Sequence, residues 1–60
     1  MPITKEQFAA YERVRQGGRY NMVMDAQLAM RAARLTHAQY WEIIRNYSVY
    51  MAQWPDVRRG

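Results

Sequence analysis

The stretch 40-YWEIIRNYSVYMAQW-54 carries two tryptophans, three tyrosines, two isoleucines and a methionine within fifteen residues. On a helical wheel at about 100° per residue, these large apolar side chains cover a continuous arc of roughly half the circumference. A surface helix of a globular protein needs an apolar stripe only somewhat wider than about 100°. The segment therefore predicts a long helix with more apolar width than one row of core contacts requires.

This apolar arc divides into two seams that point in different directions. The Trp41 seam is formed by Trp41, Ile44, Ser48 and Met51, and the Trp54 seam by Ile43, Tyr47, Tyr50 and Trp54. Two short helices earlier in the chain offer too little surface to cover both seams, so one of them is predicted to face outward. We expect this to be the Trp54 seam, because it lies near the chain end. The alternative is an aromatic-rich core that contains both.

The first helix is predicted over about residues 4–16. Thr4 and Gln7 form a T-x-x-Q capping box at its start. The pair Gly17-Gly18 ends it, since glycine adopts the left-handed C-terminal conformation at little cost. The residues expected to face solvent are Lys5, Glu6, Glu12, Arg13 and Gln16.

The second helix is predicted over about residues 22–34, with Asn21 or Asp25 as its N-cap. Its alanines would let neighbouring helices approach closely, while Leu28 and Leu35 supply the bulk. This pattern predicts a central, buried helix.

The third helix is predicted over about residues 36–54. The segment 36-THAQ-39 is a second capping box, and Pro55 disfavours helix at the residue before it. The remaining 55-PDVRRG-60 is expected to be a short mobile tail. The chain is thus predicted to be all-α, a compact three-helix bundle that forms one domain over residues 1–60.

Length and composition limit the function. A 60-residue chain buries only about 60% of the surface that its unfolded form exposes, so we expect association to support its stability. There is no cysteine, and one histidine, His37, is too little for a metal cage. No apolar run or leader pattern predicts a membrane span or signal peptide, which favours the cytoplasm.

The charge is strongly basic, with nine basic against five acidic residues and a net charge of +4. Nucleic acid, anionic surfaces and acidic proteins are therefore plausible partners. An acidic DNA mimic is excluded by this sign. A GC-rich coding sequence is an alternative explanation for so many arginines.

The segment 15-RQGGRYNM-22 surrounds a double glycine with arginines. Exposed N–H groups at such a turn and at a helix start can bind an anion. The candidate anion contacts are Arg15, Gly17, Gly18 and Arg19. The simpler interpretation is a turn in which glycine stops one helix, Asn21 starts the next and Met22 fills the core.

This segment also resembles a group of small phage-encoded proteins of unknown function, which read approximately R-x-S-G-K-x-N-M before an acidic residue. The resemblance covers less than a fifth of the chain. It implies a phage origin and an action on host machinery in the host cytoplasm, and it transfers no catalytic residue. The matching residues are Arg15, Gly18, Arg19, Asn21 and Met22, whereas Gly17 replaces a serine and Asp25 lies one residue late.

No nucleophile, base and orienting group are recognisable together, so neither an enzyme nor a cofactor is predicted. The leading hypothesis is a protein–protein interaction module that regulates or inhibits a host protein and forms a homodimer through its third helix. Nucleic-acid binding by a helix-turn-helix-like unit is the main alternative, and a nucleotide trap between two copies is a third. The predicted partner-binding residues are Ile43, Tyr47, Tyr50, Met51 and Trp54, with Arg45, Arg58 and Arg59 at the rim.

Overall fold

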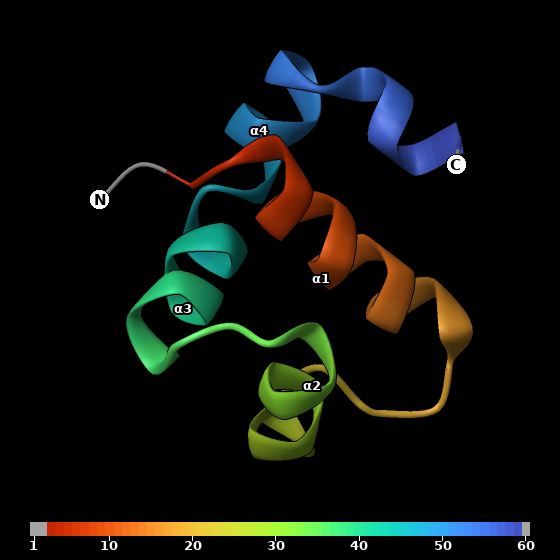
Figure 1. The fold of residues 1–60 in the computed structure, drawn as a ribbon, viewed down its shortest axis with the longest axis vertical. Coiled ribbons are helices and arrows are strands. Elements are labelled where there is room, and N and C mark those ends of the chain that lie inside the picture. Colours follow the sequence, from red (N-terminus) through yellow and green to blue (C-terminus); the bar gives the residue numbers. More distant parts are fainter. Residues whose placement is uncertain (1–2, 60) are drawn as a thin grey trace.

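The computed structural model describes residues 3–59, with side chains as far as Val57, and over this range the chain is compact and all-helical. α1 crosses the middle of the molecule, with α2 on one side and α4 on the other (Figure 1). The predicted fold class is confirmed, but the described residues form four α-helices rather than three. These are α1 (Lys5–Gly17), α2 (Ala26–Ala33), α3 (His37–Arg45) and α4 (Tyr47–Gln53), followed by the 3₁₀-helix η1 (Pro55–Arg59).

α1 begins and ends as the sequence predicts. The Thr4 hydroxyl accepts a hydrogen bond from the Gln7 N–H at 3.1 Å, and the Gln7 side chain accepts one from the Thr4 N–H at 3.0 Å. Gly18 ends the helix at φ 68°, in the left-handed region that favours glycine. One expectation is wrong: Glu12 does not face solvent but is buried beside Phe8 and Tyr11 on the inner side of α1.

α2 begins four residues later than predicted. The Asn21 side-chain oxygen accepts hydrogen bonds from the N–H groups of Val23 and Met24, both at 2.9 Å, and this holds residues 22–25 in a turn. Such local bonds to asparagine compete with helix formation. The alanine stripe is buried, but α2 is not the central helix, because α1 occupies that position. Leu28, expected in the core, is exposed.

The predicted helix over 36–54 is interrupted at Asn46. The backbone there leaves the helical region, with φ −118° and ψ 31°. The Asn46 amide donates to the Glu42 carboxylate at 3.0 Å, which gives this residue a local alternative to helix continuation. Thr36 does form its predicted capping box, and α4 ends at Gln53, before Pro55.

Residues 55–59 form η1 instead of the loose tail that was expected. Val57 packs against the core, and the Asp56 carboxylate pairs with the Lys5 ammonium at 2.7 Å. η1 thereby joins the layer that covers α1. The large side chains at the centre of the core are Phe8, Tyr40 and Ile43, surrounded by Tyr11, Met30, Leu35 and Tyr50.

Candidate functional site

The Trp54 seam, predicted to face a partner, lies against the core. Ile43 is fully buried and Tyr50 is only 8% exposed. The Phe8 ring of α1 meets the rings of Tyr47, Tyr50 and Trp54 at centroid distances of 5.7, 5.8 and 6.0 Å. The expectation that this seam faces outward is therefore wrong, since the break at Asn46 and the aromatic ring of Phe8 allow α4 to close over α1.

The hydroxyl groups of Tyr47 and Tyr50 both find hydrogen-bond acceptors when their rings are buried. The Tyr47 hydroxyl donates a short hydrogen bond to the Glu12 carboxylate of α1, and the Tyr50 hydroxyl donates to the Glu42 carboxylate of α3 at 2.9 Å. Buried polar groups need such partners. α4 is thus joined to α1 by ring contacts and the Glu12 carboxylate, and to α3 by the Glu42 carboxylate.

The Glu12 carboxylate is the centre of a buried polar cluster. Glu12 is 1% exposed, and the Arg15 guanidinium donates to both of its oxygens at 3.0 Å. Burial alone would raise the pKa of Glu12, but the hydrogen bonds from Arg15, Tyr47 and Gln16 outweigh it and hold the pKa below its usual value. The carboxylate is therefore a charged structural group with its acceptor positions occupied.

Arg45 and Met51, two further predicted partner-binding residues, differ in exposure. Arg45 is exposed, and its guanidinium lies 3.6 Å from Glu42. Met51 is partly buried against the core. The predicted rim residues Arg58 and Arg59 lie outside the part of the chain whose side chains the structure describes.

The two arginines among the candidate anion contacts differ in their surroundings. Arg15 turns to Glu12 and stacks over the Tyr47 ring at 5.6 Å, whereas Arg19 is exposed in the following turn. The Gly18 N–H donates to the Arg15 carbonyl at 3.2 Å, so it is used within the chain. The segment thus has the geometry of the simpler interpretation, a helix stop followed by the Asn21 turn.

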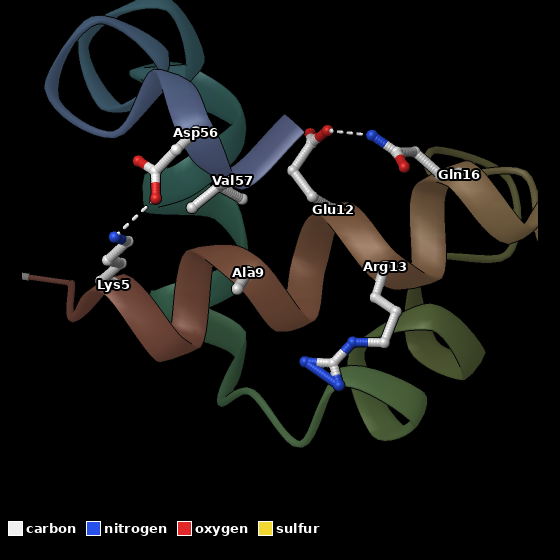
Figure 2. A pocket seen from close by; sticks show the side chains of 7 residues that line it. All are labelled: Lys5, Ala9, Glu12, Arg13, Gln16, Asp56 and Val57. Carbon is white, nitrogen blue, oxygen red and sulfur yellow. Dashed lines mark hydrogen bonds and ion pairs between the residues drawn. The ribbon is translucent and has the colours of Figure 1, made fainter. Parts of the chain in front are cut away.

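A polar hollow of about 380 Å³ lies between α1 and η1 (Figure 2). The Lys5–Asp56 ion pair closes one end, and the Gln16 amide donates to Glu12 at 3.3 Å at the other. The Arg13 guanidinium extends away from both carboxylates (Figure 2). The Lys5–Asp56 pair joins η1 to α1, whereas the partners of Glu12 lie on α1 and α4.

A second, apolar hollow of about 320 Å³ lies where α2 and α3 begin. Three apolar side chains in its lining are largely exposed: Met24 is 82% exposed, Val23 67% and Leu28 51%. Trp41 and His37 of α3 complete the wall. We call Val23, Met24, Leu28 and Trp41 the apolar patch.

Local structure explains why the apolar patch stays outside the core. The Asn21 turn fixes Val23 and Met24 before α2 begins, and the Tyr40 hydroxyl donates to the Met22 carbonyl at 2.8 Å, which secures this turn against α3. Trp41 is positioned edge-on to Tyr40, with ring centroids 5.5 Å apart. Hydrogen bonds therefore hold the backbone that carries Val23 and Met24, and Thr36 caps the helix that carries Trp41.

The sequence pattern does not predict this patch, because it assigns Leu28 to the core and residues 22–25 to a helix. The buried residues of α2 are Ala26, Ala29, Met30 and Ala33, a stripe at helical spacing, and Leu28 lies off it. The alanines alone do not indicate this, because Ala32 is exposed and lies near Leu28 on the helical wheel.

The connection between α2 and α3 is short. An eight-residue helix is followed by the three residues Arg34, Leu35 and Thr36 and by the nine-residue α3. Arg34 adopts φ 58°, Leu35 is buried, and Thr36 caps α3. The exposed residues at the start of α3 are His37 and Ala38, followed by the partly buried Trp41.

Comparisons with protein-family models, with curated proteins and with solved structures find no match to this chain. Among residues 3–59, no helix has the length and apolar character needed to cross a membrane. In the same described range, no group of three or more His, Cys, Asp or Glu side chains is placed to hold a metal ion.

Proposed function

We propose that the chain is a small protein–protein interaction module that docks its partner on the apolar patch. The observation that carries this proposal is the exposure of Val23, Met24 and Leu28 around one hollow with Trp41 in its wall. Contiguous exposed apolar surface marks interaction sites, and Trp and Met are enriched at interface centres. This keeps the predicted class of function and moves its surface from α4 to the start of α2.

The proposed mechanism is occlusion of a surface of the partner. The patch inserts its side chains into a complementary site, and basic residues nearby orient the encounter. In this proposal the chain regulates or inhibits a host protein, which extends the resemblance to small phage-encoded proteins. The capped turn and the hydrogen bond from Tyr40 keep the patch preorganised, which lowers the entropy cost of binding.

The test is affinity purification from host cells with three matched baits: the unchanged chain, Leu28→Glu and Val49→Glu. Both substitutions place a carboxylate at an exposed apolar position, since Val49 is 57% exposed on α4. A partner retained by the unchanged chain and by Val49→Glu, and lost with Leu28→Glu, supports the proposal. Retention by Leu28→Glu, with an unchanged circular dichroism spectrum, contradicts it.

Self-association through the third predicted helix stays a prediction, and Val49 is an exposed large apolar residue of α4. Sedimentation of the unchanged chain and of Val49→Glu at micromolar concentration measures it directly. A dimer that Val49→Glu separates would support a contact through α4. A dimer separated only by Leu28→Glu would show that the patch is filled by a second copy.

A second candidate function is DNA binding through α2 and α3. It is favoured by the short turn with Arg34 in the left-handed region and Leu35 in the core, the arrangement that joins the two helices of a helix-turn-helix. α3 would then be the recognition helix, although its first turns present His37, Ala38 and Trp41 to the groove. Binding to duplex DNA that weakens steeply as salt rises would support this candidate.

A further inference from the structure

The methionines of the chain differ in their access to solvent. Met24 is 82% exposed, whereas Met30 is 9% exposed and belongs to the core. Met22 and Met51 are partly buried and pack against that core. Within residues 3–59, the thioether of Met24 is therefore the one most open to a small reagent dissolved in water.

Two of these methionines lie close together in the sequence, and the Asn21 turn separates their surroundings. The Tyr40 hydroxyl lies 2.8 Å from the Met22 carbonyl and 3.8 Å from the Met22 sulfur, so this residue is held against α3. The Met24 N–H donates to the Asn21 side chain at 2.9 Å. The backbone at Met24 is thus held by a bond to which its thioether contributes nothing, and a chemical change at the sulfur leaves that bond in place.

Thioethers react with peroxides by transfer of one oxygen atom. A lone pair of the sulfur attacks one oxygen of hydrogen peroxide, the O–O bond breaks and an S–O bond forms. The proton on the transferred oxygen passes to the departing hydroxide, which leaves as water, so the sulfur is oxidised to a sulfoxide and the peroxide is reduced. The product is a polar side chain, and methionine sulfoxide reductases reverse the step. Because the peroxide must reach the sulfur, exposure decides which methionine reacts first.

Oxidation at Met24 changes the apolar patch more than it changes the fold. In the free chain the sulfoxide faces water, so the stability should stay nearly the same. In a docked complex the same group must leave water without an assured hydrogen-bond partner, which opposes burial. Met24 lines the same hollow as Leu28 and Trp41. The modification therefore acts on the surface that is proposed to dock the partner.

We propose that Met24 is a site of reversible oxidation: hydrogen peroxide converts its thioether to a sulfoxide, which places a polar group in the apolar patch and releases the bound partner. The inference rests on the proposed function and adds its regulation. It assigns the modification to one of the five methionines of the chain, so it can be tested residue by residue.

The first measurement is the rate of oxidation at each methionine. The folded chain is treated with dilute hydrogen peroxide, and tandem mass spectrometry of its tryptic peptides locates the added oxygen. Met22, Met24 and Met30 fall in one tryptic peptide, residues 20–31, so their rates are compared directly. Met24 should react about fivefold faster than Met30 or more. A rate at Met24 no higher than at Met30 overturns this inference and leaves the proposed function intact.

The second measurement repeats the purification from host cells with four baits: the unchanged chain and Met24→Leu, each before and after peroxide. Leucine keeps the apolar bulk and cannot be oxidised in this way, while every other methionine remains. The treated chain should retain about tenfold less partner, and a methionine sulfoxide reductase should restore retention. Treated Met24→Leu should retain as much partner as the same variant before peroxide.

Two results of this purification overturn the inference alone. One is equal retention by the chain before and after treatment, and the other is loss of the partner by treated Met24→Leu as well, because the sulfoxide at Met24 is then not the cause. If no retained partner is lost with Leu28→Glu, the proposed function fails and this inference fails with it.

Discussion

The Trp54 seam and the apolar patch are both rich in large apolar side chains, yet the chain buries one and exposes the other. The seam packs against the Phe8 ring of α1, and its tyrosine hydroxyl groups donate hydrogen bonds to the carboxylates of Glu12 and Glu42. In the patch, Leu28 lies off the buried alanine stripe of α2. Apolar content alone therefore does not tell which surface is a contact site.

The difference lies in the partners that each region finds within the chain. Tyrosine combines a large ring with a hydroxyl group, so it can be buried when an acceptor is near. Val23 and Met24 are exposed for a local reason, because the Asn21 turn holds them before the start of α2, and Leu28 lies off the buried stripe of that helix. The following measurements test this contrast between a buried seam and an exposed patch.

The largest effect is expected for Phe8→Ala. Phe8 is fully buried and contacts three rings of the seam, so its removal leaves a cavity and costs about 4 kcal/mol. A domain of this size has a free energy of unfolding of only about 3–9 kcal/mol. Urea unfolding should show the loss of about half of this free energy or more, and thermal unfolding a large downward shift of the midpoint. A native-like transition would mean that the seam does not depend on α1.

Glu12→Gln is expected to lower the free energy of unfolding by about 2 kcal/mol. Arg15 and Tyr47 lose a charged acceptor, while Arg15 keeps some access to water. Urea unfolding at neutral pH measures the loss, and Glu6→Gln, an exposed position in the first turn of α1, is the matched control. Equal effects of the two substitutions would contradict the assigned role of Glu12.

The stability should fall in acid because Glu12 is held charged in the fold. Its folded pKa lies below the unfolded value of about 4.3, so the unfolded chain binds the proton first as the pH drops. The contribution of Glu12 is complete above that unfolded pKa and is lost as the pH falls through the folded pKa. Glu42, whose pKa is lowered chiefly by the Tyr50 hydroxyl, acts in the same direction. In Glu12→Gln the decrease should be smaller.

Tyr40→Phe connects the two regions and should have an intermediate effect. The substitution removes the hydrogen bond from the Tyr40 hydroxyl to the Met22 carbonyl and is expected to cost about 1 kcal/mol. Hydrogen exchange should accelerate at Val23 and Met24 more than in α4. Uniform acceleration along the chain would show that the bond stabilises the whole fold and has no special effect on the patch.

The smallest effect is expected for Leu28→Ser, which should change the free energy of unfolding by less than about 0.5 kcal/mol. Leu28 is half exposed and lies off the buried stripe of α2. Leu35→Ser, a substitution of the same kind at a buried position, should cost several times more. If both substitutions destabilise equally, the patch belongs to the core.

Much of the fold was predictable because its signals are local. The capping boxes at Thr4 and Thr36, the stop at Gly18 and the end before Pro55 each depend on residues within a few positions of one another. The break at Asn46 was harder to predict. Asparagine only weakly disfavours helix, and the interruption also uses the carboxylate one turn earlier.

The candidate site could not be predicted in the same way. The Trp54 seam was expected outside because it lies near the chain end and because two short helices offered too little surface to cover both seams. The hydrogen bond between Tyr47 and Glu12 joins residues far apart in the chain, and no periodicity reveals such a pair. The exposure of Leu28 likewise depends on which alanines of α2 face the core, and the tertiary structure decides that.

The sequence by itself determined an all-helical chain, the ends of its first helix and a surplus of large apolar side chains, since backbone propensity and capping act over a few residues. The tertiary structure alone decided which of these side chains lie at the surface. That outcome depends on which distant carboxylates and rings the helices bring together, because burial of a tyrosine requires both an apolar neighbour and an acceptor for its hydroxyl.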